Sequence, residues 1–272
     1  MSNSFRKIDY RLRPAKSVER RMMAEAFLRL RSFAAVETYR YVGMGSVYFA
    51  DFAVFHAVCG FQSMTSIEDV DDPKVQARFR FNAPLGDIVL HFEHSNVALP
   101  SLNWDLRTVV WMDYDGHLGK EVLADLKYLA TKLGSGSILA VTVKADLEDD
   151  EAGHETRLEV LKSRLEGEEK LPSRLLKAGT LKSKDIPVLF REILTQELKD
   201  GINDRNAGRP EGQKYAFEQI LFFRYEDGAP MITLAWVFFD EGQRSIFTQC
   251  DFGRLKYFKS GEEPLHIQVP LI

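Results

Sequence analysis

Residues 39–46, with the sequence YRYVGMGS, decide how the rest of the chain is interpreted. The aromatic and apolar residues predict a buried strand, and Gly43 and Gly45 predict a tight turn that has no side chain at two positions. The apolar residues 47–59 predict a buried helix that opens directly from this turn. The first turn of such a helix presents free backbone N–H groups and the positive end of the helix dipole to a ligand.

A second short strand is predicted over residues 64–67, and Glu68 stands at its end. A carboxylate in this position stands where the ribose of a nucleoside or dinucleotide would be held, although a turn acid or helix-cap acid is the simpler alternative. Strand, Gly-x-Gly, helix, strand and acid together resemble the first half of a class I S-adenosylmethionine-dependent methyltransferase of the O-methyltransferase-like kind. The glycine motif is degenerate, because Tyr41 and Val42 replace the acid that usually precedes it and Val47 replaces a frequent third glycine.

The order of the downstream elements strengthens this resemblance. Three more strands are expected, with helical segments between them, and two β-rich runs flank the turn Glu226-Asp227-Gly228 as an antiparallel hairpin. The expected fold is therefore α/β, an open and mostly parallel seven-stranded sheet with helices on both faces and a C-terminal antiparallel hairpin. The expected strands after the second lie at residues 87–92, 107–112, 137–143, 215–225 and 230–239.

Four parts of one domain are expected. Residues 1–38 form a basic N-terminal arm and helix, and residues 39–145 form the cofactor-binding half of the α/β domain. Residues 146–184 are a charged helical insertion, interpreted either as a solvated excursion or as a lid. Residues 185–272 form the C-terminal half with the hairpin. The basic helix is either a solvated amphipathic helix that packs on the sheet or caps the site, or a surface for an anionic partner.

Composition indicates a globular protein and narrows its class. The chain has 272 residues, of which 45% are hydrophobic and 28% charged, with a formal net charge of −4. Its two cysteines, Cys59 and Cys250, have neither a metal-type spacing nor a disulfide pattern, which predicts a reducing, cytoplasmic setting. No secretory signal and no membrane-spanning run is recognised, so no membrane partner is expected.

Candidate site residues follow from the rule that open α/β sheets bind ligands at the carboxyl ends of their strands. The resemblance implies S-adenosylmethionine as the cofactor, Asp113 and His94 as catalytic residues, and Tyr114 and Asp115 as substrate contacts. Asp113 and Asp115 could alternatively hold a divalent metal together with a third ligand, but no metal is expected. The cofactor contacts implied are Gly43, Met44, Gly45, Ser46, Glu68 and Glu93.

The predicted reaction is methyl transfer to an oxygen or nitrogen acceptor, which is a small molecule, a protein or an RNA. The motifs of amino-methylating DNA enzymes and of cytosine C5 methyltransferases are absent, which disfavours those two chemistries. The alternative from a different class is a catalytically degraded methyltransferase-fold protein that acts as a binding or scaffolding subunit, with a protein partner or a second copy. A Rossmann-type enzyme with a nicotinamide cofactor ranks lower, because the third glycine is missing and the terminal hairpin fits it less well.

Overall fold

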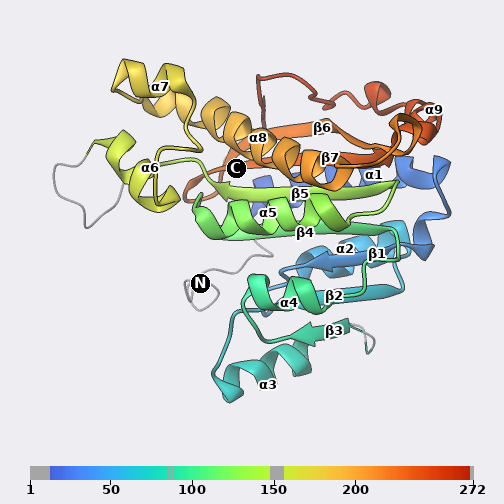
Figure 1. The fold of residues 1–272 in the computed structure, drawn as a ribbon. Helices are drawn as coiled ribbons and strands as arrows, with labels where there is room; N and C mark the ends of the chain where they lie inside the picture. The colour runs from blue at the N-terminus through green and yellow to red at the C-terminus, as the bar shows by residue number, and fades with distance from the viewer. Residues whose placement is uncertain (1–12, 85, 87, 148–155, 270–272) are drawn as a thin grey trace.

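The computed structural model describes residues 13–84, 86, 88–147 and 156–269, and their strands form one eight-stranded sheet. The strand order is β3-β2-β1-β4-β5-β7-β6-β8. The first five strands run parallel, whereas β7 is antiparallel to β5 and to β6 (Figure 1). The strands are β1 (Arg40–Gly43), β2 (Ser63–Ile67), β3 (Ile88–His91), β4 (Thr108–His117), β5 (Ser137–Lys144), β6 (Tyr215–Glu226), β7 (Pro230–Asp240) and β8 (Leu265–His266).

Strand order reverses at β1, which pairs with β2 on one side and β4 on the other. In sheets of this kind the ligand crevice lies outside the carboxyl ends of the strands at such a reversal. The predicted α/β fold with a C-terminal antiparallel hairpin is therefore confirmed, and the hairpin turns at residues 227–229, between β6 and β7. The eighth strand, β8, is a two-residue addition parallel to β6 that the seven-strand prediction lacked.

Helices cover both faces of the sheet (Figure 1). One face carries α4 (Ser95–Ser101), α5 (Lys120–Lys132), α6 (Arg157–Leu165), α7 (Ser173–Ala178) and α8 (Ile186–Asn206), and the other carries α1 (Pro14–Leu28), α2 (Ala50–Cys59), α3 (Pro73–Asn82) and α9 (Arg244–Gln249). Short 3-10 segments lie at residues 29–32, 36–38, 183–185, 211–213, 241–243 and 252–254.

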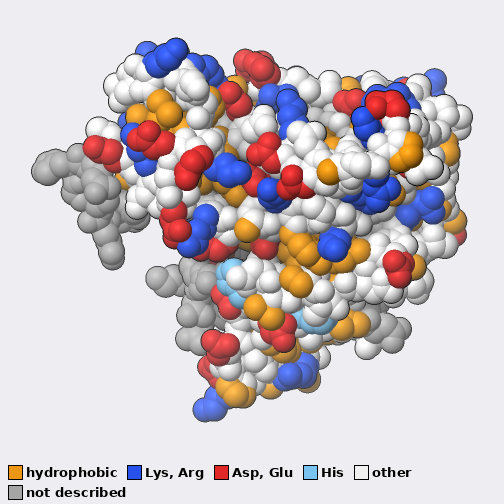
Figure 2. Space-filling model, in the orientation of Figure 1, with side chains coloured by type: hydrophobic (Ala, Val, Ile, Leu, Met, Phe, Trp, Pro, Cys, Tyr) orange, Lys and Arg blue, Asp and Glu red, His pale blue; other side chains and the backbone are white. Residues whose placement is uncertain are grey.

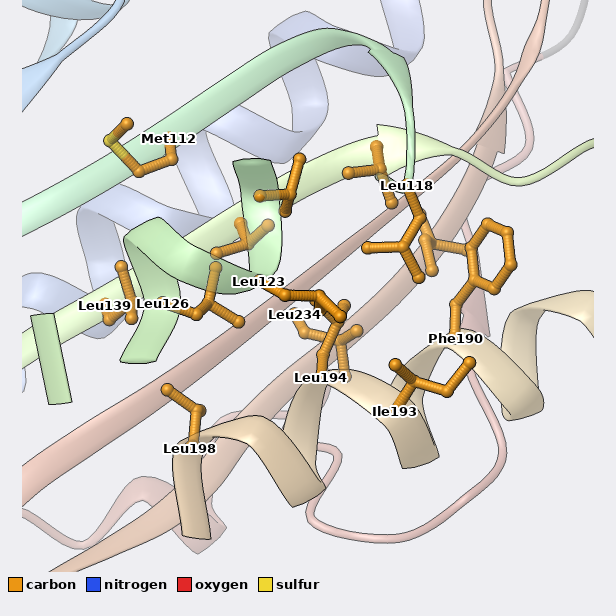
Figure 3. Close-up of a cluster of buried hydrophobic side chains, with 14 of the residues drawn as sticks. Met112, Leu118, Leu123, Leu126, Leu139, Phe190, Ile193, Leu194, Leu198 and Leu234 are labelled. Carbon is orange, nitrogen blue, oxygen red and sulfur yellow. The ribbon is translucent and has the colours of Figure 1, made fainter. Parts of the chain in front are cut away.

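The face beneath α5 and α8 is a core of aliphatic side chains. Three completely buried leucines belong to this core: Leu126 from α5, Leu194 from α8 and Leu139 from β5 (Figure 3). These helices show the apolar spacing expected of elements that pack one stripe on a sheet. The opposite face is aromatic: the ring of Tyr41 lies 4.9 Å from that of Phe52 and 5.0 Å from that of Phe55, both edge-on.

Two boundaries differ from the sequence-based expectation. The helix α2 begins at Ala50 and not at residue 47, because residues 46–49 form a turn in which Ser46 and Phe49 both have φ of 47°. Strand β4 continues to His117 instead of ending at residue 112, since its far end still pairs with β5 after a register shift. Helix α8 continues to Asn206, because Leu198 and Ile202 keep its apolar stripe buried.

The charged insertion is not merely a solvated excursion in its described part. The apolar residues Leu158, Leu161 and Leu165 of α6 are all buried and belong to the core beneath α5 and α8. The capping box of Thr156 and Glu159 fixes the start of this helix. The middle of the insertion, residues 148–155, lies outside the described residues, as do residues 1–12 of the predicted basic arm.

Candidate active site at the carboxyl ends of the strands

The glycine turn is packed against aromatic side chains of its own chain. A Cβ atom on Gly43 would lie 2.5 Å from the hydroxyl oxygen of Tyr41, and one on Gly45 would lie 2.5 Å from Cδ1 of Phe49. Both separations are far shorter than a carbon atom tolerates, so neither glycine accepts a side chain without moving a neighbouring ring. The left-handed backbone at Phe49 belongs to the turn that separates the strand from α2.

Glu68 is joined directly to the glycine turn. Its Oε1 atom accepts hydrogen bonds from the backbone N–H of Gly45 at 2.8 Å and from the hydroxyl of Ser66 at 2.6 Å. Burial raises the pKa of Glu68 to about 8, against the opposing effect of these hydrogen bonds, and the nearby Asp51 raises it further. The carboxyl group therefore lies beside the turn, and its raised pKa favours the neutral form below about pH 8.

Asp113 is held by a buried lysine from the N-terminal helix. The ammonium of Lys16 donates to Oδ1 of Asp113 at 2.7 Å and to the hydroxyl of Tyr225 at 2.9 Å, and it lies 3.0 Å from a carboxyl oxygen of Glu19. It also sits 4.4 Å from the ring centroid of Trp111. The Lys16 side chain is 4% exposed, whereas that of Asp113 is 23% exposed. Solvent therefore reaches the carboxylate of Asp113 but hardly reaches Lys16.

The hairpin turn fixes the start of α1, and with it the position of Lys16. Asp227 accepts a hydrogen bond from the backbone N–H of Lys16 at 2.9 Å and a longer one from that of Ala15 at 3.4 Å. A carboxylate at a helix N-terminus satisfies free N–H groups and interacts favourably with the helix dipole. Residues about 210 positions apart in the chain thus assemble one side of the site.

Asp51 and Tyr41 add a second buried polar pair in the same neighbourhood. The hydroxyl of Tyr41 donates to Oδ2 of Asp51 at 2.5 Å, so Asp51 faces neither solvent nor an open loop. Burial raises the pKa of Asp51, Arg20 lowers it, and Asp113 raises it. Tyr41 lies near the position where the methyltransferase pattern usually has an acid. The hydrogen bond from Tyr41 holds the carboxyl group of Asp51, a residue of α2, close to the turn.

Four carboxyl groups therefore converge near the carboxyl ends of β1, β2 and β4. They belong to Glu19, Asp51, Glu68 and Asp113, and each of the first three has its pKa raised by burial. The cations that act on this group are Lys16, which bonds Asp113, and Arg20, which lowers the pKa of Asp51. A positively charged ligand bound beside these four acids would favour the charged forms of the carboxyl groups whose pKa values burial raises.

Tyr114 follows Asp113 and points to the opposite face of the sheet, as alternation along a strand requires. Its hydroxyl donates to Oδ2 of Asp125 at 2.6 Å, and the hydroxyl of Ser95 donates to the same oxygen. Tyr114 therefore belongs to a polar cluster between β4, α4 and α5 and not to the Lys16–Asp113 side. Asp115 is half-buried, and no described cluster of His, Cys, Asp or Glu side chains has the arrangement of a metal site.

The two predicted residues after β3 lie at the start of α4. His94 is the N-cap of this helix, and its Nδ1 atom lies 2.9 Å from Oδ1 of Asn96, while Glu93 is exposed. His117, the last residue of β4, pairs with Asp146, with 2.7 Å between Nε2 and Oδ1. Burial lowers the pKa of His117, and the hydrogen bond to Asp146 opposes this effect. Neither histidine is hydrogen bonded to Asp113 in the described contacts.

The structure thus brings Gly45, Ser66 and Glu68 into direct contact and places Asp113 in a separate ion pair. Sequence reasoning missed Lys16, Glu19 and Tyr225, which surround Asp113. A signal was present for the first two: Lys16 and Glu19 lie on the helical face that also carries Met23, Ala26 and Phe27, so they occupy buried positions of the apolar stripe. Nothing local to Asp227 or Tyr225 indicates their role, because it depends on the hairpin folding back onto α1.

The chain belongs to a family of methyltransferases. Residues 8–272 match the model of the family described as "Putative O-methyltransferase". With this membership, the strand order and the hairpin define the Rossmann-like fold of class I S-adenosylmethionine-dependent methyltransferases. No curated protein matches the chain in sequence. Among the described residues, no helix is both long and apolar enough to span a membrane.

Solved structures with similar folds include several methylases. Similarity extends to a ribosomal protein L11 methylase from Lactobacillus delbrueckii subsp. bulgaricus, with 13% identity over 78% of this chain and 75% of that chain and a TM-score of 0.41. An rRNA methylase from Streptococcus thermophilus shares 7% identity over 79% and 93% of the two chains, with a TM-score of 0.39. Cofactor-bound Rv0187 from MTB shares 11% identity over 78% of each chain, with a TM-score of 0.39.

The residues at the strand ends fit the cofactor that the family uses. A buried carboxyl group at the end of β2, beside a turn without side chains, has the acceptor atoms that a ribose diol needs. A ligand with a positively charged sulfur would favour the charged forms of these buried carboxyl groups. The aromatic rings that fill the Cβ positions of both glycines show that the turn also serves the packing of α2 against the sheet.

Proposed function

We propose that this protein transfers a methyl group from S-adenosylmethionine to an oxygen acceptor, or to a nitrogen acceptor of similar geometry. The observation that carries the proposal is the contact between Glu68 and the backbone of Gly45 beside the acidic cluster. The family description supports oxygen as the acceptor atom. Small molecules, proteins and RNA all remain candidate acceptors, and the solved neighbours include enzymes named for rRNA and for a ribosomal protein.

The cofactor side of the proposed site comprises the turn and the two following strand ends. Glu68 accepts hydrogen bonds from the ribose hydroxyls, and residues 43–46 contact the methionine part through their backbone. Glu93, at the end of the next strand, contacts the adenine. When bound, S-adenosylmethionine supplies an electrophilic methyl group on a positively charged sulfur. A cation bound beside Asp51 and Glu68 would favour the charged forms of their carboxyl groups, whose pKa values burial raises in the free protein.

The acceptor side is built around Asp113. Its carboxylate is partly exposed, and Lys16 holds one of its oxygens at 2.7 Å. The other oxygen is proposed to accept the proton of the acceptor hydroxyl, so that a lone pair of the acceptor oxygen is directed at the methyl group. His94 is the second candidate base, and Tyr114 and Asp115 are proposed acceptor contacts at the far end of β4.

Isothermal titration with S-adenosylmethionine and S-adenosylhomocysteine, with NAD as the control ligand, tests the proposal. We expect micromolar binding of the first two and none of NAD. Glu68→Gln keeps the size of the side chain and an acceptor for Gly45, and it is expected to weaken binding at least tenfold. Glu37→Gln, an exposed change at the amino end of β1, is the matched control and should bind normally.

Failure of both adenosyl ligands to bind the folded protein would contradict the enzymatic proposal. That result would favour the alternative of a degraded methyltransferase fold acting as a binding or scaffolding subunit. The rings of Tyr41 and Phe49 beside both glycines are the observation that supports this second function. The protein partner or second copy would then be sought by crosslinking of the intact chain.

A further inference from the structure

A groove of about 510 Å³ lies between α8 and the first half of β6, outside the candidate active site. Its floor and walls include Tyr215 and Phe217 of β6 and Trp236 of β7. Phe217 pairs with Phe238, which in turn pairs with Ser137 at the start of β5. The groove is therefore at the amino end of the parallel strands, opposite the end where Glu68 and Asp113 lie.

Arg191 lies at one wall of this groove, and hydrogen bonds through Gln219 fix the orientation of its side chain. The side-chain amide of Gln219 donates to the carbonyl oxygens of Lys259 and Gly261, at 2.7 and 2.9 Å. Its oxygen then accepts from Nε of Arg191 at 2.8 Å, which fixes the direction of the guanidinium. The described carboxylate nearest to its terminal nitrogens belongs to Glu262, at 3.9 Å and on a side chain that is 76% exposed.

The other ionisable side chains that line the groove are two lysines and three glutamates. Its three carboxylates are each engaged by a cation: Glu211 by Lys214, and both Glu218 and Glu241 by Arg244. Lys199, which also lines the groove, makes no ion pair with any described side chain. Figure 2 shows Lys and Arg side chains interspersed with Asp and Glu over α8. Lys199 is thus the lining cation without an ion pair among the described side chains, and the carboxylate that approaches Arg191 is that of the exposed Glu262, at 3.9 Å.

Two buried donors at the groove also lack partners. The indole Nε1 of Trp236 and the hydroxyl of Thr195 have no hydrogen-bond partner, and both residues line the groove. An unpaired buried polar group costs stability and calls for a ligand or water that satisfies it. A preorganised guanidinium, a second cation, aromatic walls and unpaired donors together describe a receptor for an anion with a flat ring.

We propose that this groove is a second binding site, which takes a small aromatic anion bearing a carboxylate or phosphate group. Arg191 binds the anionic group through its terminal N–H groups, Lys199 adds charge, and the ring packs against Tyr215 and Phe217. The site is independent of methyl transfer, because its residues lie at the opposite end of the sheet from the cofactor contacts.

Titration of the full-length protein with 2-naphthoate and 2-naphthyl phosphate, against the neutral amide 2-naphthamide, tests this site. We expect both anions to bind and the amide to bind at least tenfold more weakly, because charge-assisted hydrogen bonds are the stronger ones. Arg191→Gln should lower anion affinity about tenfold or more and leave the amide unaffected. Lys177→Gln, an exposed lysine on α7, is the matched control and should change neither.

Nuclear magnetic resonance gives a local readout, because the chain has three tryptophans and hence three indole N–H signals. Trp236→Phe assigns one of them, and we expect that signal to move when 2-naphthoate is added while those of Trp104 and Trp111 stay in place. The relative binding of carboxylate and phosphate then distinguishes the two kinds of anion. Absence of binding by both anions, or affinity unchanged in folded Arg191→Gln, would overturn the proposal.

Discussion

The two faces of the sheet differ in how they are stabilised. The face beneath α5 and α8 is packed with aliphatic side chains such as Leu126, Leu139 and Leu194, all of them completely buried. The face beneath α1 and α2 is aromatic and encloses the buried charges of Lys16 and Glu19. Burial of apolar side chains stabilises a fold and does not depend on the orientation of the contacts. A buried charge, in contrast, is tolerated only when an oppositely charged partner lies beside it. The first face therefore supports the fold, and the second gives the site its chemistry.

The largest expected effect comes from a cavity in the aliphatic face. Leu194→Ala removes a completely buried side chain at the contact between α8 and the sheet (Figure 3), and we expect it to lower the free energy of unfolding by about 2–5 kcal/mol. Urea denaturation followed by circular dichroism measures this loss. Val97→Ala, at a side chain that is 55% exposed, is the control and should cost less than about 0.5 kcal/mol. Equal losses in the two variants would contradict the assigned packing.

The next effect concerns the buried charges of the other face. Lys16→Met removes the ammonium but keeps much of the volume, and it leaves Asp113 and Glu19 without their cation. We expect a loss of about 3 kcal/mol in the free energy of unfolding, the low end for breaking a buried pair, because Asp113 is partly exposed.

A double-mutant cycle separates the ion pair from simple packing. Lys16→Met combined with Asp113→Asn removes both charges of the pair, so part of the stability lost in Lys16→Met should return. Denaturation of the two single variants and the double variant measures the coupling energy. If the losses simply add, the contact between Lys16 and Asp113 does not contribute to stability.

The same difference between the faces explains what could be predicted from the sequence. Strand and helix positions followed from local periodicity, and the terminal hairpin followed from two β-rich runs around a turn that contains glycine. The order of the strands across the sheet was not predicted and is given by the structure. Glu68 and the glycine turn were predicted because they lie within a short stretch of chain. The partners of Asp113 were not, since Lys16 lies 97 positions and Tyr225 lies 112 positions from it, beyond any local pattern.

The local geometry of the glycine turn could not be predicted from the sequence either. The spacing of Gly43 and Gly45 suggested a helix that begins directly after the turn, at residue 47. In the structure the ring of Phe49 packs beside Gly45, and the helix begins at Ala50. The ring packing depends on three-dimensional contacts with Phe52 and Phe79. A glycine pair thus predicts that some group lies close to the backbone of the turn. The structure shows that the rings of Tyr41 and Phe49 lie there.

A smaller effect is expected on the pH dependence of cofactor binding. Burial raises the pKa of Glu68 to about 8, so its carboxyl group is mainly neutral in the free protein at pH 6 to 7. Ribose hydroxyls and a cationic sulfur favour the charged form, so binding releases a proton and affinity rises with pH until it levels near pH 8. Titration in two buffers of different ionisation enthalpy measures the released proton. Glu68→Gln should abolish this pH dependence, and an unchanged profile would remove Glu68 from the site.

The raised pKa of Glu68 also affects stability, with a defined sign. The folded protein binds this proton more tightly than the unfolded chain does, where the pKa is near the ordinary value of 4.5. The stabilising contribution is therefore fully present below about pH 4.5 and is lost as pH rises through about 8. Comparison of Glu68→Gln with the parent protein between pH 5 and 8 isolates this contribution, because the glutamine does not titrate.

The smallest expected effect separates the two sides of β4. Tyr114→Phe removes the hydroxyl that donates to Asp125 at 2.6 Å, while Ser95 still donates to the same carboxylate. We therefore expect a loss of about 0.5–1.5 kcal/mol in the free energy of unfolding and no change in cofactor affinity. The Michaelis constant for the acceptor decides whether the ring also contacts substrate: an increase supports the proposed acceptor contact, and an unchanged value restricts Tyr114 to the structural cluster. Because Tyr114 and Asp113 are adjacent yet face opposite sides, this result tests whether the acceptor reaches one face of β4 or both.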